Sequence, residues 1–323
     1  MRYLMLVVFI LFTGCYHNIP TTSKVETFLN YHELEGERIL SKPDDYLGSN
    51  DMEFKTQLEK KYTQLFGDKK IDFSMYDNPT LQGLWKVNNT MAFQCLEKKY
   101  LYNLEEIFEI LKKRNIEKEN YIVNKTTYNY VEDIFGFYIL FGDFSKANSL
   151  KNEYQSILKS EVVPIVYDNA SIMGEDCKLY KISDDGRSIS LISVNIKEGP
   201  KIIFVSNPGC DFSKQAMKLT SATPELRNIF KKYATIIISL STSMSYLNDM
   251  AVWNKNNPEL EHFIYPHQDK LQGCLNKFSF LGGPKLYFIK DNKIVYQIRG
   301  FDPRESKYIS DVYNGIKQIG IEI

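Results

Sequence analysis

One cysteine stands where a predicted strand gives way to a helix. The segment KIIFVSNPGCDFSKQAM, residues 201–217, has four consecutive apolar residues, a Pro-Gly pair, Cys210 and then a helix-like sequence. The apolar run and the turn residues predict a buried strand that ends just before the cysteine. In the first turn of a helix, unpaired backbone N–H groups and the helix dipole favour a thiolate over a thiol. Because the thiolate is the nucleophile, the segment predicts thiol chemistry at Cys210.

The neighbours of Cys210 indicate a one-cysteine site. A redox dithiol would carry its second cysteine three residues later, but the sequence has Ser213 there. The Ser213 hydroxyl is one helical turn away and can donate a hydrogen bond that stabilises the thiolate. Lys214 adds a positive charge that acts in the same direction, while Asp211 acts against it. The predicted site is therefore Cys-x-x-Ser.

The remaining cysteines form no Cys-x-x-Cys pair, so their spacing indicates neither a zinc knuckle nor a disulfide-dense scaffold. Cys95 and Cys177 fit buried core positions, because free cysteines are among the most buried residues. A disulfide between these two is permitted in an oxidising compartment but is not indicated by the sequence. Cys274 lies in a helix predicted at 268–278 and is either a resolving thiol for Cys210 or a buried structural cysteine.

The first fifteen residues, MRYLMLVVFILFTGC, predict an export signal. The apolar run after Arg2 is shorter than the about 20 residues that cross a bilayer, and its length fits a signal peptide. The Thr-Gly-Cys ending resembles a bacterial lipoprotein signal, in which the cysteine is lipidated and becomes the mature N-terminus. This resemblance implies a protein of the bacterial cell envelope, anchored to a membrane through Cys15 and facing the periplasm. An ordinary signal peptide with an incidental cysteine is the alternative.

The mature chain divides into a tether, a helical domain and an α/β domain. Residues 16–30 begin as a polar stretch and predict the tether. Residues 31–160 repeat apolar residues at intervals of three and four, which predicts an all-helical domain. Within it, residues 100–115 can be laid over residues 140–155, which predicts two helical hairpins. With 323 residues, 43% of them hydrophobic, the chain can bury two cores.

Residues 161–323 alternate strands with helices before a final hairpin, which predicts an α/β sandwich with a mixed sheet. Asp184-Asp185-Gly186 and Asp291-Asn292 are turn signals between β-branched runs. The predicted order of elements is an entry hairpin, a strand at 202–206, a helix at 211–233, a strand at 235–240, a helix at 245–256, a strand at 263–265, a helix at 268–278, a hairpin at 284–300 and a helix at 303–318.

This order resembles the thioredoxin fold, in particular its TlpA-like and AhpC/TSA-like branch. The likeness is carried by CKLYKISDDGRSISLISVNIKEGPKIIFVSNPGC (177–210), which ends at the family's nucleophile position, Cys210. It is also carried by FSFLGGPKLYFIKDNKIVYQIRGF (278–301). The resemblance implies that Pro284 is the family's cis-proline and that Gly300 is the glycine after the last strand. It also implies a groove at Pro284 where an extended substrate chain pairs with the backbone.

Three departures from the family pattern limit this site. Ser213 replaces the second cysteine, so a neighbouring thiol cannot resolve a mixed disulfide at Cys210. Phe204 occupies the position six residues before the nucleophile, where the family often has a buried acid for proton transfer. The peroxiredoxin signature needs Pro at 203 and Thr or Ser at 207, but the sequence has Ile203 and Asn207. Peroxidase activity of that kind is therefore not expected.

Charge and composition disfavour other functions. The 40 acidic and 40 basic residues balance, and no block of like charge marks an interaction tail, so nucleic acid is not an expected partner. His262 and His267 flank a predicted strand, but the copper site of thioredoxin-fold metallochaperones would need a cysteine where this sequence has Lys214. His17 and His32 fit solvent-facing positions. No metal and no cofactor are expected.

The sequence leaves two functional hypotheses. In the first, a membrane-anchored, exported thioredoxin-like protein exchanges thiols and disulfides through Cys210, with Ser213 stabilising the thiolate and Pro284 shaping the groove. Its partners would be protein thiols or disulfides, or an external thiol reductant. In the second, a non-catalytic lipoprotein uses the same fold to bind or scaffold a protein partner. The reactivity of the Cys210 thiol distinguishes the two.

Overall fold

The computed structural model of the chain contains two compact units. It describes residues 21–40, 49–67, 70–123, 126–159, 163–167, 177–196, 198–207, 210–239, 247–266, 278 and 283–322. The described residues 21–40 and those from 50 to 134 belong to unit 1, and the described residues from 135 onward belong to unit 2. The sequence-based boundary near residue 160 lies where the sequence pattern changes from helical to strand-like. The compact units of the structure divide earlier, between residues 134 and 135. Packing and sequence pattern thus divide the chain at different points.

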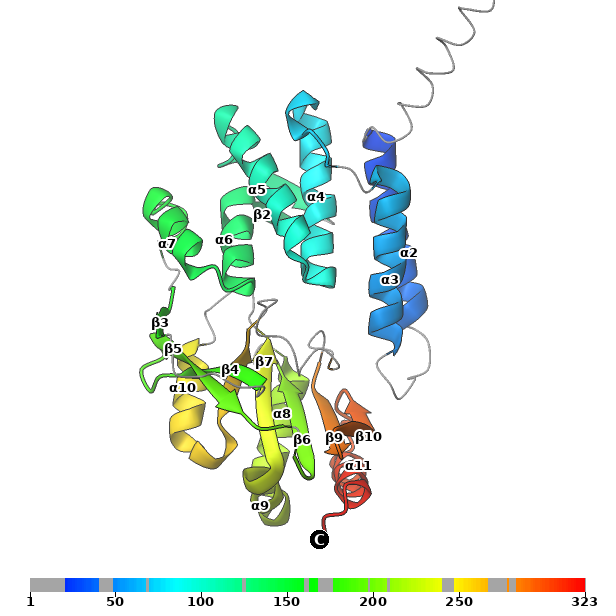
Figure 1. The fold of residues 1–323 in the computed structure, drawn as a ribbon, viewed down its shortest axis with the longest axis vertical. Helices are drawn as coiled ribbons and strands as arrows, with labels where there is room; N and C mark the ends of the chain where they lie inside the picture. The colour runs from blue at the N-terminus through cyan, green and yellow to red at the C-terminus, as the bar shows by residue number, and fades with distance from the viewer. Residues whose placement is uncertain are drawn as a thin grey trace, which may run out of the picture. The chain divides into compact units, whose positions relative to one another are not determined.

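Unit 1 contains helices and one hairpin (Figure 1). Its elements are α2 (Thr22–Leu40), α3 (Ser49–Phe66), the 3-10 helix η2 (Phe73–Met75), α4 (Asn78–Cys95), α5 (Lys98–Lys113), β1 (Asn120–Val123), β2 (Thr126–Asn129) and the start of α6 (Tyr130–Leu140). The predicted helical character is confirmed. The tether prediction is wrong for residues 22–30, because buried Val25 and Phe28, spaced one turn apart, extend α2 back to Thr22.

Helices α2 and α3 pack antiparallel through aromatic and charged pairs. The ring centroids of Phe28 and Tyr62 lie 6.2 Å apart, and a guanidinium nitrogen of Arg38 lies 3.1 Å from a carboxylate oxygen of Glu53. Residues early in α2 therefore meet residues late in α3, and the reverse. Helices α4 and α5 follow each other through a tight turn, in which Leu96 adopts the left-handed conformation with φ 55°.

A β-hairpin accompanies the helices of unit 1, and the prediction of an all-helical domain missed it. Strands β1 and β2 pair antiparallel with Tyr121 opposite Tyr128, and the two rings stack with centroids 5.7 Å apart. The segment NYIVNKTTYN, residues 120–129, is rich in β-branched and aromatic residues, which favour strands. The segment is too short to show a clear two-residue period, which explains why the sequence pattern did not reveal it.

The two segments aligned at an offset of 40 residues differ in structure. Residues 100–115 lie mostly in the single helix α5, whereas residues 140–155 contain the end of α6, a turn and helix α7 (Phe144–Glu153). At that turn Gly142 has φ 70°, and the Asp143 carboxylate accepts a hydrogen bond from the Lys146 N–H at 3.2 Å. The two segments are therefore not copies of one hairpin.

Unit 2 carries, within its described residues, a mixed sheet of eight strands. After α7 its elements are β3 (Ile165–Tyr167), β4 (Cys177–Ile182), β5 (Ser188–Val194), β6 (Lys201–Ser206), α8 (Asp211–Ala222), α9 (Pro224–Tyr233), β7 (Ala234–Ser239), α10 (Leu247–Asn256), the 3-10 helix η3 (Pro258–Leu260), β8 (His262–Tyr265), β9 (Lys285–Lys290), β10 (Lys293–Arg299) and α11 (Glu305–Gln318). The α/β class with a mixed sheet, preceded by helices, is confirmed.

The strand order across the sheet is β10-β9-β6-β7-β8-β4-β5-β3. Strands β6, β7 and β8 run parallel, while β9 pairs antiparallel with both β6 and β10. The entry hairpin β4–β5 pairs with this group through β8. A parallel group joined through helices, followed by an antiparallel hairpin and a closing helix, agrees with the thioredoxin fold that the sequence resemblance implied.

The long helix predicted at 211–233 is two helices. Thr223 is extended, with φ −94° and ψ 109°, and ends α8, while Pro224 begins α9. Proline lacks a backbone N–H and clashes with the preceding turn of a helix, but it fits the first turn of a new one. The helix predicted at 268–278 lies outside the described residues except for Phe278.

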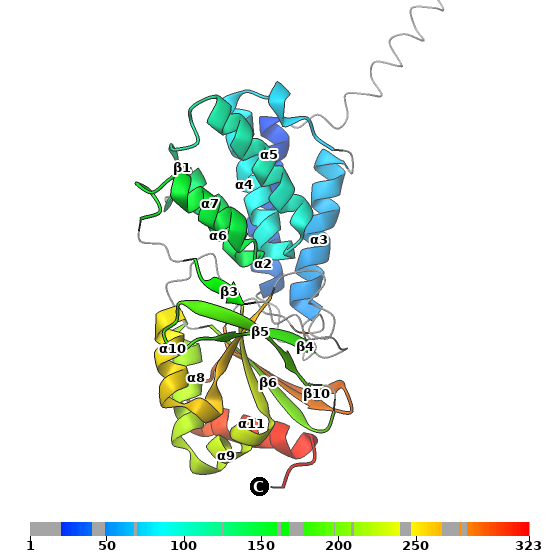
Figure 2. The same ribbon diagram turned by 60° about the vertical axis from the view of Figure 1, so that its left-hand side comes forward.

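Strand β6 is buried on both faces of the sheet. Ile202 and Phe204 enter a core cluster with side chains of α8, α9 and α11, the helices seen against the sheet in Figure 2. Ile203 and Val205 enter a second cluster, which includes Cys177. The alternation follows from the two-residue period of a strand. Strands covered on both faces read as continuous hydrophobic runs, which is the pattern seen in the sequence.

Helix α11 approaches strand β9 closely at Gly315. A Cβ atom placed on Gly315 would lie 2.4 Å from Cε2 of Phe288, whose ring is fully buried. A neighbour must move to accommodate a contact this short, and a ring in a close-packed core has little space to move into. Glycine at this position therefore lets α11 pack against the strand that follows Pro284.

We expect Gly315→Ala to destabilise unit 2 by about 1–3 kcal/mol, because overpacking outweighs the about 1 kcal/mol that alanine gains over glycine in a helix. Gly36→Ala is the control, because a Cβ there would lie 3.5 Å from the Phe54 ring, an ordinary contact. That variant should be neutral or stabilised. Urea unfolding of the full chain measures both, and a stabilising effect of Gly315→Ala would contradict the close approach.

Candidate functional site

Two of the predicted site residues, Cys210 and Pro284, lie at one edge of the sheet in unit 2. The parallel strands β6, β7 and β8 end at this edge, and the antiparallel strand β9 begins there. The register pairs Val205 with Lys285, so Pro284 lies beside the end of β6, and Cys210 follows that end by a short loop. The topology therefore brings Cys210 and Pro284 to the same edge.

Cys210 is a free, half-buried cysteine at the beginning of α8. Its backbone is extended, with φ −97° and ψ 121°. Its N–H donates to the Asn207 carbonyl at 2.9 Å, and its carbonyl accepts from the Lys214 N–H at 3.1 Å. The sulfur makes no capping hydrogen bond, so the N–H groups of the first turn keep their capacity to stabilise negative charge on it.

Ser213 is buried and holds the loop that leads to Cys210. Its Oγ accepts a hydrogen bond from the Asn207 N–H at 3.0 Å. Among the described residues no hydrogen bond joins Ser213 to the Cys210 sulfur, although the hydroxyl hydrogen remains available for one. The structure thus gives Ser213 a positioning contact that the sequence did not suggest, and its predicted action on the thiolate stays a prediction.

Asp211 and Lys214, which the sequence treats as opposing influences on Cys210, form an ion pair with each other. The Lys214 ammonium lies 3.3 Å from Asp211 Oδ1, and both side chains are exposed. An exposed pair of this kind is screened by water and contributes little. The two charges therefore largely cancel at the site.

The Gly283–Pro284 peptide bond is trans, so the expectation of a cis-proline is wrong. None of the peptide bonds that the structure describes is cis. The trans form is the ordinary one, because even before proline it is favoured by about 0.5–1 kcal/mol. The Pro284 carbonyl accepts a hydrogen bond from the Gly300 N–H at 2.7 Å, and Gly300 has φ 76°. The groove predicted at Pro284 therefore lacks the cis peptide bond that the family has at this position.

The other cysteines give Cys210 no reactive neighbour within the described residues. Cys177 is buried, as predicted, but it is in a disulfide whose other cysteine lies outside them. Cys95 is free, which excludes the Cys95–Cys177 disulfide, and burial raises the pKa of its thiol to about 12. The predicted resolving thiol, Cys274, also lies outside the described residues.

The histidines give no metal site in the described part of the chain. His262 is buried beside Trp253, with centroids 5.7 Å apart, and burial lowers its pKa to about 4. His32 is half-buried against Phe54 rather than solvent-facing, because α2 and α3 pack together. His17 and His267 lie outside the described residues. No group of three or more His, Cys, Asp or Glu side chains among the described residues could hold a metal ion.

An aromatic pair beside Cys210 is a feature that sequence reasoning missed. Phe212 is an exposed residue of the first turn of α8, and its ring stacks on that of Phe301, with centroids 6.5 Å apart. The sequence shows Phe212 two positions after the cysteine but does not show that its side chain is exposed. Its partner could not be found, since Phe301 follows β10, far along the chain.

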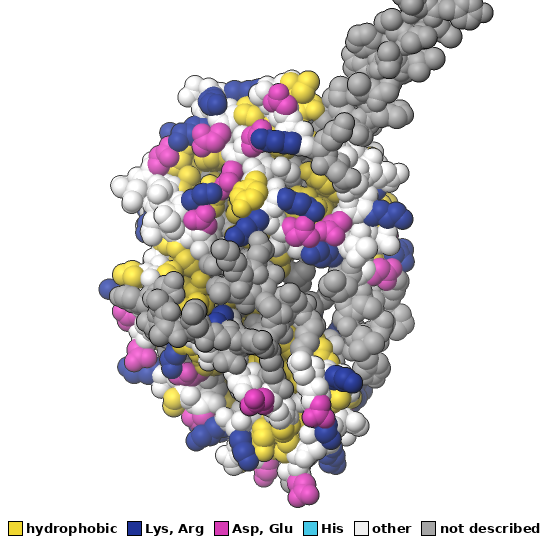
Figure 3. Space-filling view, viewed as in Figure 1, with side chains coloured by type: hydrophobic (Ala, Val, Ile, Leu, Met, Phe, Trp, Pro, Cys, Tyr) yellow, Lys and Arg dark blue, Asp and Glu magenta, His cyan; other side chains and the backbone are white. Residues whose placement is uncertain are grey.

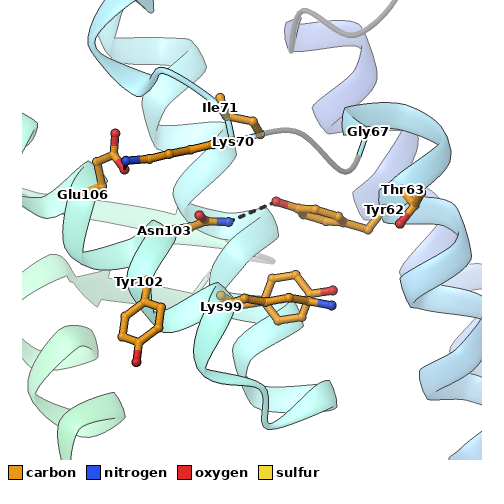
Figure 4. A pocket seen from close by; sticks show the side chains of 10 residues that line it. Tyr62, Thr63, Gly67, Lys70, Ile71, Lys99, Tyr102, Asn103 and Glu106 are labelled. Carbon is orange, nitrogen blue, oxygen red and sulfur yellow. Dashed lines mark hydrogen bonds and ion pairs between the residues drawn. The ribbon is translucent and has the colours of Figure 1, made fainter.

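A pocket of about 500 Å³ lies in unit 1, between α3 and α5 (Figure 4). Four of its polar side chains contact one another in two pairs: Asn103 Nδ2 donates to the Tyr62 hydroxyl at 3.2 Å, and the Lys70 ammonium lies 3.3 Å from the Glu106 carboxylate. A ligand would have to displace these pairs. We therefore assign no site to this pocket.

The predicted lipoprotein signal, including Cys15, lies outside the described residues. Within the described part of the chain, no helix combines the length and hydropathy that a membrane span requires. On the face of the molecule seen in Figure 3, Lys and Arg side chains are interspersed with Asp and Glu. This distribution agrees with the equal numbers of acidic and basic residues in the sequence.

Comparison with known proteins adds little to the description of this site. No family model matches the sequence, and no curated protein matches it. Among solved structures, a thioredoxin-like protein from Bacteroides caccae is similar at 12% identity over 72% of this chain and 77% of that chain, with a TM-score of 0.26. At this identity and TM-score the likeness carries no functional argument, so the site is interpreted from its own residues.

A half-buried carboxylate in unit 1, that of Asp133, accepts hydrogen bonds from three side chains. Asp133 Oδ2 accepts from the Tyr121 hydroxyl, from Trp85 Nε1 at 3.2 Å and from Asn89 Nδ2 at 3.0 Å. Burial raises the pKa of Asp133 to about 6, although hydrogen bonds from Tyr121 and Trp85 partly oppose this. The network joins the β1–β2 hairpin to α4 and α6.

Asp133 makes the stability of unit 1 depend on pH. Because its pKa is higher in the folded state than in the unfolded chain, its contribution to the free energy of unfolding falls as pH rises from about 4 to about 6. The Asp133→Asn variant should lack this pH dependence, because asparagine does not titrate. Its free energy of unfolding minus that of wild type should therefore rise by about 1–2 kcal/mol between pH 4 and pH 7.

Urea unfolding followed by Trp85 fluorescence in a Trp253→Phe background measures this difference. Glu132→Gln is the control, because Glu132 is an exposed neighbour on the same helix. A wild-type minus Asp133→Asn difference that stays flat across this pH range would contradict the raised pKa.

Proposed function

We propose that the protein exchanges thiols and disulfides through the single thiol of Cys210, as an exported thioredoxin-like protein of the TlpA-like and AhpC/TSA-like branch. The observation that carries the proposal is the position of Cys210, a free, half-buried thiol that begins α8 where β6 ends. Free cysteines are usually buried and inert, as Cys95 is. A thiol kept accessible at a helix N-terminus suits a nucleophile.

The reaction begins when the Cys210 thiolate attacks one sulfur of a substrate disulfide. The substrate S–S bond breaks, a disulfide forms between Cys210 and the substrate, and the second substrate sulfur leaves as a thiolate that takes up a proton. One disulfide replaces another, so the step gains and loses no electrons overall. The first turn of α8 stabilises the attacking thiolate, and Ser213 fixes the loop that presents it.

A second thiol releases the substrate from Cys210. Its thiolate attacks the substrate sulfur, and Cys210 leaves as a thiolate. When the attacker is the substrate's own second thiol, the disulfide is isomerised. When it is an external thiol, a second equivalent of that thiol frees the substrate, which is reduced while the external thiol is oxidised to its disulfide. Cys95 is buried and Cys177 is disulfide-bonded, so we assign the release to a thiol of a partner molecule.

A non-catalytic binding role is the second candidate. Two observations favour it: the Gly283–Pro284 bond is trans, and Phe204 is wholly buried in the core where the family often has an acid. In this reading the fold holds a protein partner at the same sheet edge. Reactivity of Cys210 toward disulfides, and not the fold, separates the two candidates.

We expect wild-type protein to form a mixed disulfide at Cys210 that persists after the disulfide reagent is removed, because no second thiol stands at position 213. Ser213→Cys should release the adduct at least about tenfold faster, because the introduced thiol is one helical turn from Cys210. Mass spectrometry of the adduct with a peptide disulfide, followed over time, measures both.

Ser221→Cys is the matched control, because the same substitution further along α8 cannot reach Cys210. Cys210→Ser should form no adduct. Release that is fast in wild type without any added thiol would contradict release by a partner. A native protein whose Cys210 forms no adduct, while the unfolded protein does, would contradict thiol exchange and favour the binding role.

We further propose that acyl chains on Cys15 anchor the protein to a membrane of the bacterial envelope, facing the periplasm. Wild-type protein should then partition into the detergent phase of a Triton X-114 extraction, and Cys15→Ser should move to the aqueous phase, because the lipid chains supply the membrane affinity. Cys210→Ser keeps Cys15 and should behave as wild type. Aqueous partitioning of the wild-type protein would contradict the anchor.

A further inference from the structure

Phe212 and Phe301, here named the aromatic pair, form an apolar surface that thiol exchange alone does not require. Phe212 lies in the first turn of α8, two residues after Cys210, and is 52% exposed. Its ring stacks on that of Phe301, with centroids 6.5 Å apart and planes 27° apart. A single exposed apolar side chain is ordinary, but two stacked rings next to an accessible thiol form an apolar surface of the kind that marks interaction sites.

The aromatic pair is held by the core of unit 2. Phe301 packs on the buried ring of Tyr308 in α11, with centroids 5.0 Å apart. It also follows Gly300, whose N–H is bonded to the Pro284 carbonyl. Phe212 is held by α8 and by its contact with Phe301. The ring faces are therefore presented as a fixed surface, which lowers the entropic cost of binding to them.

The charges beside the aromatic pair are neutralised in pairs. Lys214 contacts Asp211, and the Arg304 guanidinium donates to both carboxylate oxygens of Asp302, at 2.9 and 2.6 Å. These neighbours therefore offer little net charge to attract a charged peptide. An apolar side chain, in contrast, would cover ring surface that now contacts water. The surface favours an apolar occupant.

We infer that the aromatic pair selects substrates whose reacting cysteine is flanked by aromatic or aliphatic residues, and that Phe212 is the specificity-determining residue. The inference rests on the proposed exchange reaction at Cys210. Phe212 is two residues from Cys210 in the sequence, so a side chain seated on its ring belongs to a residue near the cysteine whose sulfur joins Cys210. The substrate class is an extended polypeptide with apolar residues around a disulfide-bonded cysteine.

Two synthetic peptides test this, each with one cysteine disulfide-bonded to thionitrobenzoate. One peptide has Phe and Leu beside the cysteine, and the other has Ser at both positions. Attack of the Cys210 thiolate on the peptide sulfur forms the peptide adduct and releases the coloured thionitrobenzoate thiolate, whose absorbance gives the rate. We expect wild-type protein to react about fivefold to tenfold faster with the apolar peptide, the size of effect expected from one aromatic contact.

Phe212→Ser should bring the ratio of the two rates to about one, by slowing the apolar peptide and leaving the serine peptide unchanged. Phe212→Trp should keep the preference. Val252→Ser is the matched control, because Val252 is a similarly exposed apolar residue on α10, and it should keep the wild-type ratio. Alkylation of Cys210 by iodoacetamide should proceed at the wild-type rate in all three variants, which separates recognition from thiol reactivity.

Equal rates for the two peptides in wild-type protein, or a preference that survives Phe212→Ser, would overturn the aromatic pair as the selecting surface and leave exchange at Cys210 standing. Failure of both peptides to form an adduct would overturn the exchange reaction and this inference with it. Loss of preference together with slower alkylation in Phe212→Ser would also overturn the inference, because the substitution would then act on the thiol itself.

Discussion

The candidate site depends on the burial of strand β6 in the middle of its sheet. β6 lies between β7 and β9 and sends apolar side chains into a core cluster on each face. A shift of β6 by one residue would exchange the two sets of side chains between the two cores, so the register is strongly fixed. The end of β6 is fixed with it, and so is the place where Cys210 begins α8. The packing of unit 2, rather than the loop alone, positions the thiol.

The parts of the fold that the sequence predicted are those decided by local chemistry. Gly186, with φ 68°, and the successive residues Asp291 and Asn292, with φ 49° and 60°, adopt the left-handed conformations that their turns require. The apolar run of β6 identified a buried strand without knowledge of its neighbours. The break at Pro224 was also local, but the helical periodicity on both sides concealed it. The β1–β2 hairpin was missed because its strands are short and packed by tertiary contacts.

The site was predictable only in part. Cys210 was found because its placement follows from a strand, a turn and a helix that adjoin in sequence. The resemblance to thioredoxin-fold proteins led to the prediction of a cis peptide bond before Pro284, but that bond is trans. The disulfide of Cys177 and the contact of Phe212 with Phe301 depend on residues distant in sequence, which a single sequence does not bring together. Composition gave the charge balance, but not the pairing that cancels charge beside the thiol.

The division of the predicted long helix at Thr223 has a consequence for the electric field at the sulfur. The field at a helix N-terminus comes mainly from the unpaired N–H groups of its first turn and falls off within that turn. Helix α8 alone, at Asp211–Ala222, therefore supplies the field at Cys210. Helix α9 can change direction after Pro224 and follow the sheet, where Leu226 and Phe230 complete the core, without changing the first turn of α8. Because of the break, α8 provides the helix N-terminus at Cys210 and α9 packs against the sheet. One continuous helix would have had to do both.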